Sequence, residues 1–127
     1  MAGWSNDELT KIGGAEEVDV AALRGDGTPR KRVTVWLVRH GDGLYVRSAV
    51  RGANATWYRG AVETRHGRIW AAGIHKDVTF EAAGSNLNDE IDAEYRDKYR
   101  RYAGRILNSC LTPEARSTTL RLVPRSA

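Results

Sequence analysis

The sequence predicts a mainly β domain in which an antiparallel sheet closes into a small barrel flanked by helices. Three observations lead to this fold class. Short β-branched runs are joined by glycine-containing turns, the strongest amphipathic helix comes just before the last strand, and the strands are linked mainly as hairpins. Hairpin links give antiparallel pairing, and closure into a barrel removes the exposed strand edges.

The N-terminal segment predicts a short helix followed by a strand. Ser5 with Glu8 three residues later forms a capping box, and Gly13-Gly14 ends the helix. The apolar run from Val18 to Leu23 predicts the first strand, and residues 25–29 (GDGTP) predict a turn.

A β-hairpin is expected next. Residues 33–38 (VTVWLV) form one β-branched or apolar strand, Gly41-Asp42-Gly43 supplies a turn with positive φ, and Leu44 to Val46 starts the return strand. Residues 56–64 then suit a short helix that follows a loop.

The second half predicts another hairpin, a longer helix and a closing strand. The hairpin pairs residues 68–72 with 77–82 around a turn at 73–76, with Val78 and Phe80 on one face. Asn88 is expected to cap the longer helix, whose acidic first turn and basic end complement the helix dipole. Its apolar stripe consists of Ile91, Tyr95, Tyr99 and Tyr102. Residues 113–116 predict one more helical turn, and residues 118–123 the last strand.

Length and composition favour a single domain, residues 1–127, in the cytoplasm. The one cysteine, Cys110, excludes an internal disulfide, and no apolar stretch reaches membrane-spanning length. His40, His66 and His75 lack the spacing of a zinc site, so no metal is expected.

The charge is distributed unevenly along the chain. Residues 1–23 carry five carboxylates against one lysine, a net charge of −4, which leaves +8 for the rest of a chain whose total is +4. This basic part attracts anionic partners in general. Nucleic acid is the least favoured of them, because the aromatic residues do not interleave with Lys and Arg along strands.

Basic and aromatic residues gather just after the Leu44 to Val46 strand. Arg47, Ser48 and Arg51 could hold a phosphate, because guanidinium groups and hydroxyls donate hydrogen bonds to phosphate oxygens. Trp57 and Tyr58, with Trp36 and Arg32 nearby in the sequence, could bind a flat ring. The plainer interpretation is a solvated arginine, a turn serine and aromatic core packing. Tyr58 and His75 are candidate proton donors.

The residues from Val33 to Tyr58 resemble the flavin-binding split β-barrels, which include the flavin reductases and pyridoxamine-phosphate oxidases, and in particular the small deazaflavin-dependent nitroreductase-like branch. The resemblance lies in the aromatic Trp36 within a strand, the Gly/Asp turn, Arg47-Ser48 after the return strand, and the Trp57-Tyr58 pair. The whole chain is similar to an uncharacterised bacterial family of this size. That second resemblance rests on residues 4–9 (WSNDEL), 44–48 (LYVRS), 77–80 (DVTF), 113–116 (PEAR) and 119–122 (TLRL).

The resemblance implies a homodimer that binds FMN or a deazaflavin and reduces a small conjugated substrate. One segment departs from the pattern: a stretch like Gly-Arg-Lys-Ser-Gly, which binds cofactor phosphate, is replaced by residues 24–32 (RGDGTPRKR), where Asp26 would repel phosphate. The alternative is therefore a barrel without cofactor that binds a small aromatic or polyketide-like ligand and transforms it by acid/base chemistry.

Overall fold

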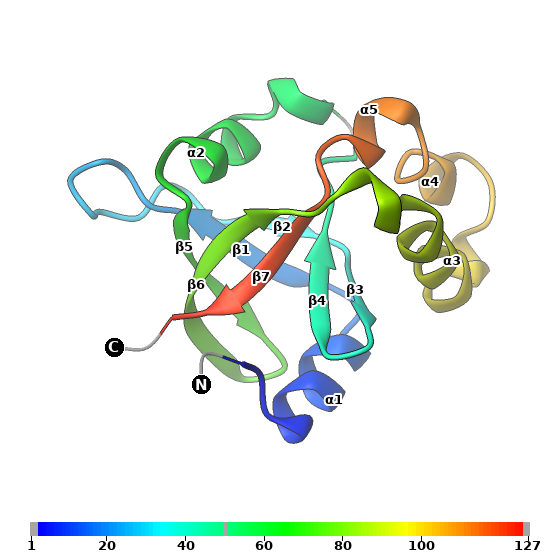
Figure 1. The fold of residues 1–127 in the computed structure, drawn as a ribbon, viewed down its shortest axis with the longest axis horizontal. Helices are drawn as coiled ribbons and strands as arrows, with labels where there is room; N and C mark the ends of the chain where they lie inside the picture. The colour runs from blue at the N-terminus through cyan, green and yellow to red at the C-terminus, as the bar shows by residue number, and fades with distance from the viewer. Residues whose placement is uncertain (1–2, 50, 126–127) are drawn as a thin grey trace.

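The computed structural model describes residues 3–49 and 51–125 and contains a seven-stranded antiparallel sheet curled into a barrel (Figure 1). The strand order is β2-β1-β5-β6-β7-β4-β3, so the predicted antiparallel barrel is confirmed. The strands are β1 Val18–Ala22, β2 Val33–Val35, β3 Leu37–His40, β4 Gly43–Val46, β5 His66–Ala71, β6 Ile74–Ala82 and β7 Leu120–Pro124. The helices are α1 Asn6–Gly14, α2 Thr56–Thr64, α3 Asn88–Lys98, α4 Arg105–Asn108 and α5 Pro113–Arg116, with 3-10 turns η1 Gly52–Asn54, η2 Ser85–Leu87 and η3 Arg100–Tyr102.

The two edges of the sheet are consecutive in the chain. Strand β2 pairs only with β1 and strand β3 only with β4, and the single residue Trp36 connects them. The prediction of one continuous strand over residues 33–38 is therefore wrong. The chain leaves one edge of the sheet and enters the other at Trp36, which is where the barrel is split.

Lys98, the last residue of α3, and Tyr99, which follows it, hold this split together. The Leu37 amide donates to the Tyr99 hydroxyl at 3.2 Å, and the Leu37 carbonyl accepts from that hydroxyl at 3.1 Å and from Lys98 Nζ at 2.5 Å. The Trp36 ring stacks on the Tyr99 ring with centroids 3.9 Å apart and an interplanar angle of 2°. Backbone groups that lose their ladder partners at the split are thus satisfied by side chains.

The helix predictions are largely confirmed, with two exceptions at the ends of α3. Ser5 and Glu8 form the expected capping box at α1, and α2 spans the expected residues 56–64. Asn88 is the first residue of α3 rather than its cap, because the 3-10 turn η2 runs directly into the helix. Ile91 and Tyr95 are buried on α3 as expected, and Tyr99 is buried directly after it. Tyr102 was wrongly predicted to continue this stripe, because α3 ends at Lys98 and the half-buried Tyr102 lies in the 3-10 turn η3.

The second hairpin turns earlier than expected. Ala72 and Gly73 both have positive φ, 51° and 79°, and form the turn between β5 and β6. The turn predicted at residues 73–76 is therefore wrong, and His75 lies within β6 opposite Trp70.

Apolar side chains form two separate cores. The barrel interior contains Leu44, Val46, Phe80, Leu120 and Leu122, and α1 packs against this interior through Leu9 and Ile12. The second core lies between the barrel and the α3 to α5 side of the molecule (Figure 1). It contains Val38, Tyr45, Ile91, Tyr95, Tyr99, Leu107 and Cys110. None of the helices in the described ranges is both long and apolar enough to cross a membrane.

Candidate functional site

A cavity of about 360 Å³ lies beside the split, where strand β2, the end of β4 and the start of α2 meet the α4 region. It therefore lies at the strand end where the sequence predicted a ligand. Its lining residues are Glu17, Val33, Thr34, Val35, Trp36, Arg47, Ser48, Ala49, Arg51, Ala55, Trp57, Ile106, Ser109 and Cys110.

Most of the cavity wall is apolar. Val33 and Val35 come from the edge strand β2, and Trp57 comes from the first turn of α2 with only 8% of its surface exposed. Trp57 meets Tyr58 edge to face with ring centroids 6.1 Å apart, but Tyr58 packs against the barrel core and does not line the cavity. The predicted Trp57-Tyr58 pair thus contributes one ring to the cavity rather than two.

Polar groups lie at the rim. Ser48 lines the cavity and is buried, and its backbone amide donates to Thr118 Oγ1 at 2.8 Å. Arg51 is exposed, and no carboxylate of the described ranges lies within ion-pair distance of its guanidinium. Glu17 is the acidic residue among those that line the same cavity. Of the three predicted phosphate donors, Arg51 is therefore the most available.

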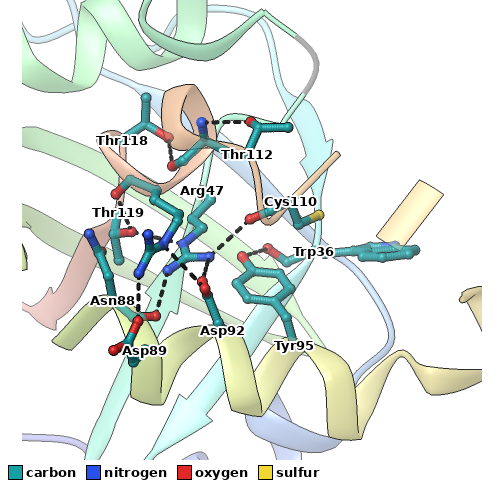
Figure 2. Close-up of polar contacts among 12 residues, drawn as sticks. Trp36, Arg47, Asn88, Asp89, Asp92, Tyr95, Cys110, Thr112, Thr118 and Thr119 are labelled. Carbon is teal, nitrogen blue, oxygen red and sulfur yellow. Dashed lines mark hydrogen bonds and ion pairs between the residues drawn. The ribbon is translucent and has the colours of Figure 1, made fainter. Parts of the chain in front are cut away.

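Arg47 makes a buried network with the protein itself (Figure 2). Its side chain is 0% exposed, and Nη1 donates to Asp92 Oδ1 at 2.5 Å and to the Cys110 carbonyl at 2.9 Å. Its Nε donates to Thr119 Oγ1 at 2.8 Å, and its Nη2 donates to the Asn88 carbonyl at 3.3 Å. A ligand at the cavity would have to displace these partners in order to use the Arg47 guanidinium.

Asp92 joins this network to a second arginine. Its other oxygen lies 3.2 Å from Arg116 Nε, and Arg116 Nη2 donates to Asp89 Oδ1 at 2.7 Å. One buried carboxylate thus links the end of β4 to α3 and α5, the elements beside the cavity. The sequence left two interpretations of Arg47 open, a solvated arginine and a phosphate donor. Neither of them describes this buried arrangement.

The remaining predicted residues lie elsewhere. The Arg32 guanidinium lies 3.8 Å above the Trp70 ring and 3.9 Å from Asp19, and it does not line the cavity. His75 is exposed on β6, away from the lining residues. Asp26 is also outside the cavity, and its carboxylate accepts hydrogen bonds from Thr28 that lower its pKa. The objection that Asp26 would repel a phosphate therefore does not apply at this cavity.

Sequence reasoning missed the part of the site that comes from residues 106–110. Ile106, Ser109 and Cys110 line the cavity although they follow α3 in the chain. The segment has no periodic pattern, and its position depends on packing against α3 and β4. Cys110 is buried, and no local signal in the sequence indicated that it would line a cavity.

Cys110, the thiol that lines the cavity, is not activated as a nucleophile. Burial raises the pKa of the Cys110 thiol, which keeps it protonated at neutral pH. Burial also raises the pKa of the Tyr95 hydroxyl, which lies in the second core beside Arg47. Across residues 3–49 and 51–125, no three His, Cys, Asp or Glu side chains gather closely enough to hold a metal ion.

Solved structures with the same fold include a heme storage protein, an F420 reductase and an FAD-binding protein. The heme storage protein HutZ from Vibrio cholerae is 14% identical, with a TM-score of 0.66, over 89% of this chain and 84% of that chain. An F420 reductase is 18% identical, with a TM-score of 0.52, over 94% of this chain and 93% of that one. An FAD-binding protein from Mesorhizobium loti is 17% identical, with a TM-score of 0.53, over 97% and 91% of the two chains.

These similarities show that the fold is the flavin-reductase-like split barrel, as the resemblance implied. It is a fold in which related proteins bind flavin, F420 or heme. No curated protein sequence matches the chain. The model of one family matches residues 8–122, and that family is described as "Uncharacterized protein conserved in bacteria (DUF2255)". The chain therefore belongs to this bacterial family and carries its split barrel.

Proposed function

We propose that the protein binds a flavin-type cofactor, a flavin or a deazaflavin, in the cavity beside Trp36 and uses it to reduce a small conjugated substrate. The observation that carries the proposal is the cavity itself, which combines apolar walls with Arg51, an exposed arginine with no carboxylate of the described residues in ion-pair distance. Small-molecule sites typically have this composition, with few polar groups that fix orientation. The split-barrel neighbours that bind FAD or F420 support the same class of ligand.

The residues present fit such a group. The side chains of Val33, Val35 and Trp57 would contact a planar ring, and Arg51 with the Ser48 hydroxyl would bind a phosphate at the rim. A bound flavin supplies the hydride chemistry. The chain supplies orientation and exclusion of water, because Cys110 and Trp57 are almost completely buried where they line the cavity.

Titration tests the proposal directly. Riboflavin, FMN, FAD and a deazaflavin cofactor are added to the purified chain, and binding is followed by the change in ligand fluorescence. Arg51→Gln should weaken FMN by about tenfold to a hundredfold, the scale of a lost hydrogen bond to a charged group, and leave riboflavin unchanged. Arg59→Gln, an exposed arginine of α2 outside the cavity, is the matched control. Failure of wild type to bind any of the four compounds would reject the proposal.

A second candidate function is binding of a small aromatic ligand without a cofactor. The observation that favours it is the Arg47 network, which occupies one of the expected phosphate donors. A planar aromatic carboxylate such as a hydroxynaphthoate is the probe. If the chain binds this probe and binds none of the four cofactors, the second candidate function is favoured.

We further propose that the protein is a homodimer that does not bind nucleic acid. Strand β2 pairs on one side only, and its residues line the cavity, so a second copy could cover the cavity from that side. Sedimentation velocity at micromolar concentration should give a dimer, and a monomer would contradict this. An oligonucleotide should show no binding at physiological salt. A cytoplasmic location stays a prediction.

A further inference from the structure

A second cavity adjoins the first. It measures about 580 Å³ and shares four lining residues with the first cavity, namely Ala49, Arg51, Ile106 and Ser109. Its other walls are Gly52, Arg105, Thr112 and Glu114. Two cavities with a common wall can hold two parts of one ligand.

Ile106 lies at the boundary and is unusually exposed. At 58% it is the most exposed large apolar side chain of the described residues, and it lines both cavities. A single exposed isoleucine is ordinary on a protein surface, but Ile106 lies between the two cavities. A flat ring placed on it would remove apolar surface from water.

Two cations accompany this apolar surface. Arg51 lines both cavities and Arg105 lines the second, and within residues 3–49 and 51–125 no carboxylate lies within 4.0 Å of either guanidinium. Guanidinium groups without a protein partner are suited to phosphate oxygens, and they also stack on flat rings. Because Arg51 lines both cavities, its positive charge lies where the two cavities meet.

We propose that the two cavities form one site for a flavin dinucleotide. The flavin ring occupies the first cavity, the linking phosphates contact Arg51, and the nucleobase lies over Ile106 in the second cavity beside Arg105. This assignment rests on the proposed function, because it assumes that the first cavity binds a flavin ring.

The test compares FAD with FMN, which lacks the second ring. Wild type should bind FAD at least about tenfold more tightly than FMN. Arg105→Gln should weaken the binding of FAD by about fivefold to thirtyfold and leave the binding of FMN unchanged, because Arg105 lines only the second cavity. Ile106 lines both cavities, so Ile106→Ser should weaken the binding of FAD more than that of FMN. Both positions are exposed, so the variants should fold, and thermal unfolding without ligand checks this. Arg96→Gln, an exposed arginine of α3 outside both cavities, is the matched control.

The outcomes separate the two ideas. If FMN and FAD bind with equal affinity and neither variant changes that affinity, the second cavity does not hold the nucleobase. The proposed function would still stand. A chain that binds neither compound would overturn both. Loss of FMN binding in Arg105→Gln would also contradict the assignment, because it would place Arg105 at the first cavity.

Discussion

At the scale of single residues, the buried Asp92 is the most consequential side chain outside the barrel. It is 8% exposed and holds Arg47, whose side chain is 0% exposed. Asp92→Ala should lower the free energy of unfolding by about 3 to 5 kcal/mol, because it leaves a buried guanidinium without its counterion. Urea unfolding measures the effect. Asp97→Ala, in an exposed pair with Arg100, is the control and should change stability by about 0.5 kcal/mol or less.

Arg47 also shows what sequence reasoning can and cannot recover at this scale. Its position after a strand predicted a site, and it does line the cavity wall. Its partner Asp92 lies on α3, where an acidic residue in the first turns was interpreted as favourable to the helix dipole. Nothing local distinguishes such a carboxylate from a buried counterion, because the pairing depends on how α3 docks. A loss of less than about 1 kcal/mol in Asp92→Ala would contradict the buried-pair interpretation.

Lys98 gives a pH dependence of stability. Burial lowers its pKa from 10.5 to about 8 in the folded chain. Between about pH 8 and pH 10 the unfolded chain therefore holds more protons at this residue, and its contribution makes stability rise with pH. The free energy of unfolding is measured against pH in that range for wild type and Lys98→Met. The difference between the two slopes isolates the contribution of Lys98. Comparison with the variant is needed because burial raises the pKa of Tyr99, which lowers stability at higher pH. Identical slopes in both proteins would contradict the prediction.

At the scale of elements, the junction of β2 and β3 depends on one hydroxyl. Tyr99→Phe removes the acceptor of the Leu37 amide and should lower the free energy of unfolding by about 1 to 3 kcal/mol, the cost of a buried donor without a partner. Tyr102→Phe makes the same chemical change in an exposed contact with Glu16 and should cost about 0.5 kcal/mol or less. Chemical denaturation of both variants provides the measurement. Equal losses would show that the junction has no special role.

Elements specified by local signals were predicted well. The capping box at Ser5, the turn at Gly41 and the helix over residues 56–64 all appear as expected. The break at Trp36 was missed because residues 33–38 are uniformly suited to a strand. It results from sheet closure, which requires the chain to change partners there. The second turn was misplaced because Ala72, a non-glycine residue, takes a positive φ.

At the scale of the whole molecule, the positive charge of residues 24–127 should affect ligand binding. FMN carries a phosphate and riboflavin does not, so only FMN should lose affinity as salt is raised. The reason is that salt shortens the range of attraction from about 10 Å at 0.1 M to about 3 Å at 1 M. Titrations of both compounds at 0.05 and 0.5 M salt measure the difference. A parallel response of the two compounds would show that the phosphate gains nothing from the charge of the chain.

The sheet edges that meet at Trp36 also bear on how the chain folds. The hairpins β3–β4 and β5–β6 are local in sequence, whereas β4 and β7 pair across most of the chain. Local hairpins close the smaller loops and can form first, and the distant pairings follow. Trp36 lies between the two sheet edges and stacks on Tyr99, so we predict that this stacking forms late in folding. Substitutions at Trp36 should accordingly speed unfolding while leaving the refolding rate nearly unchanged.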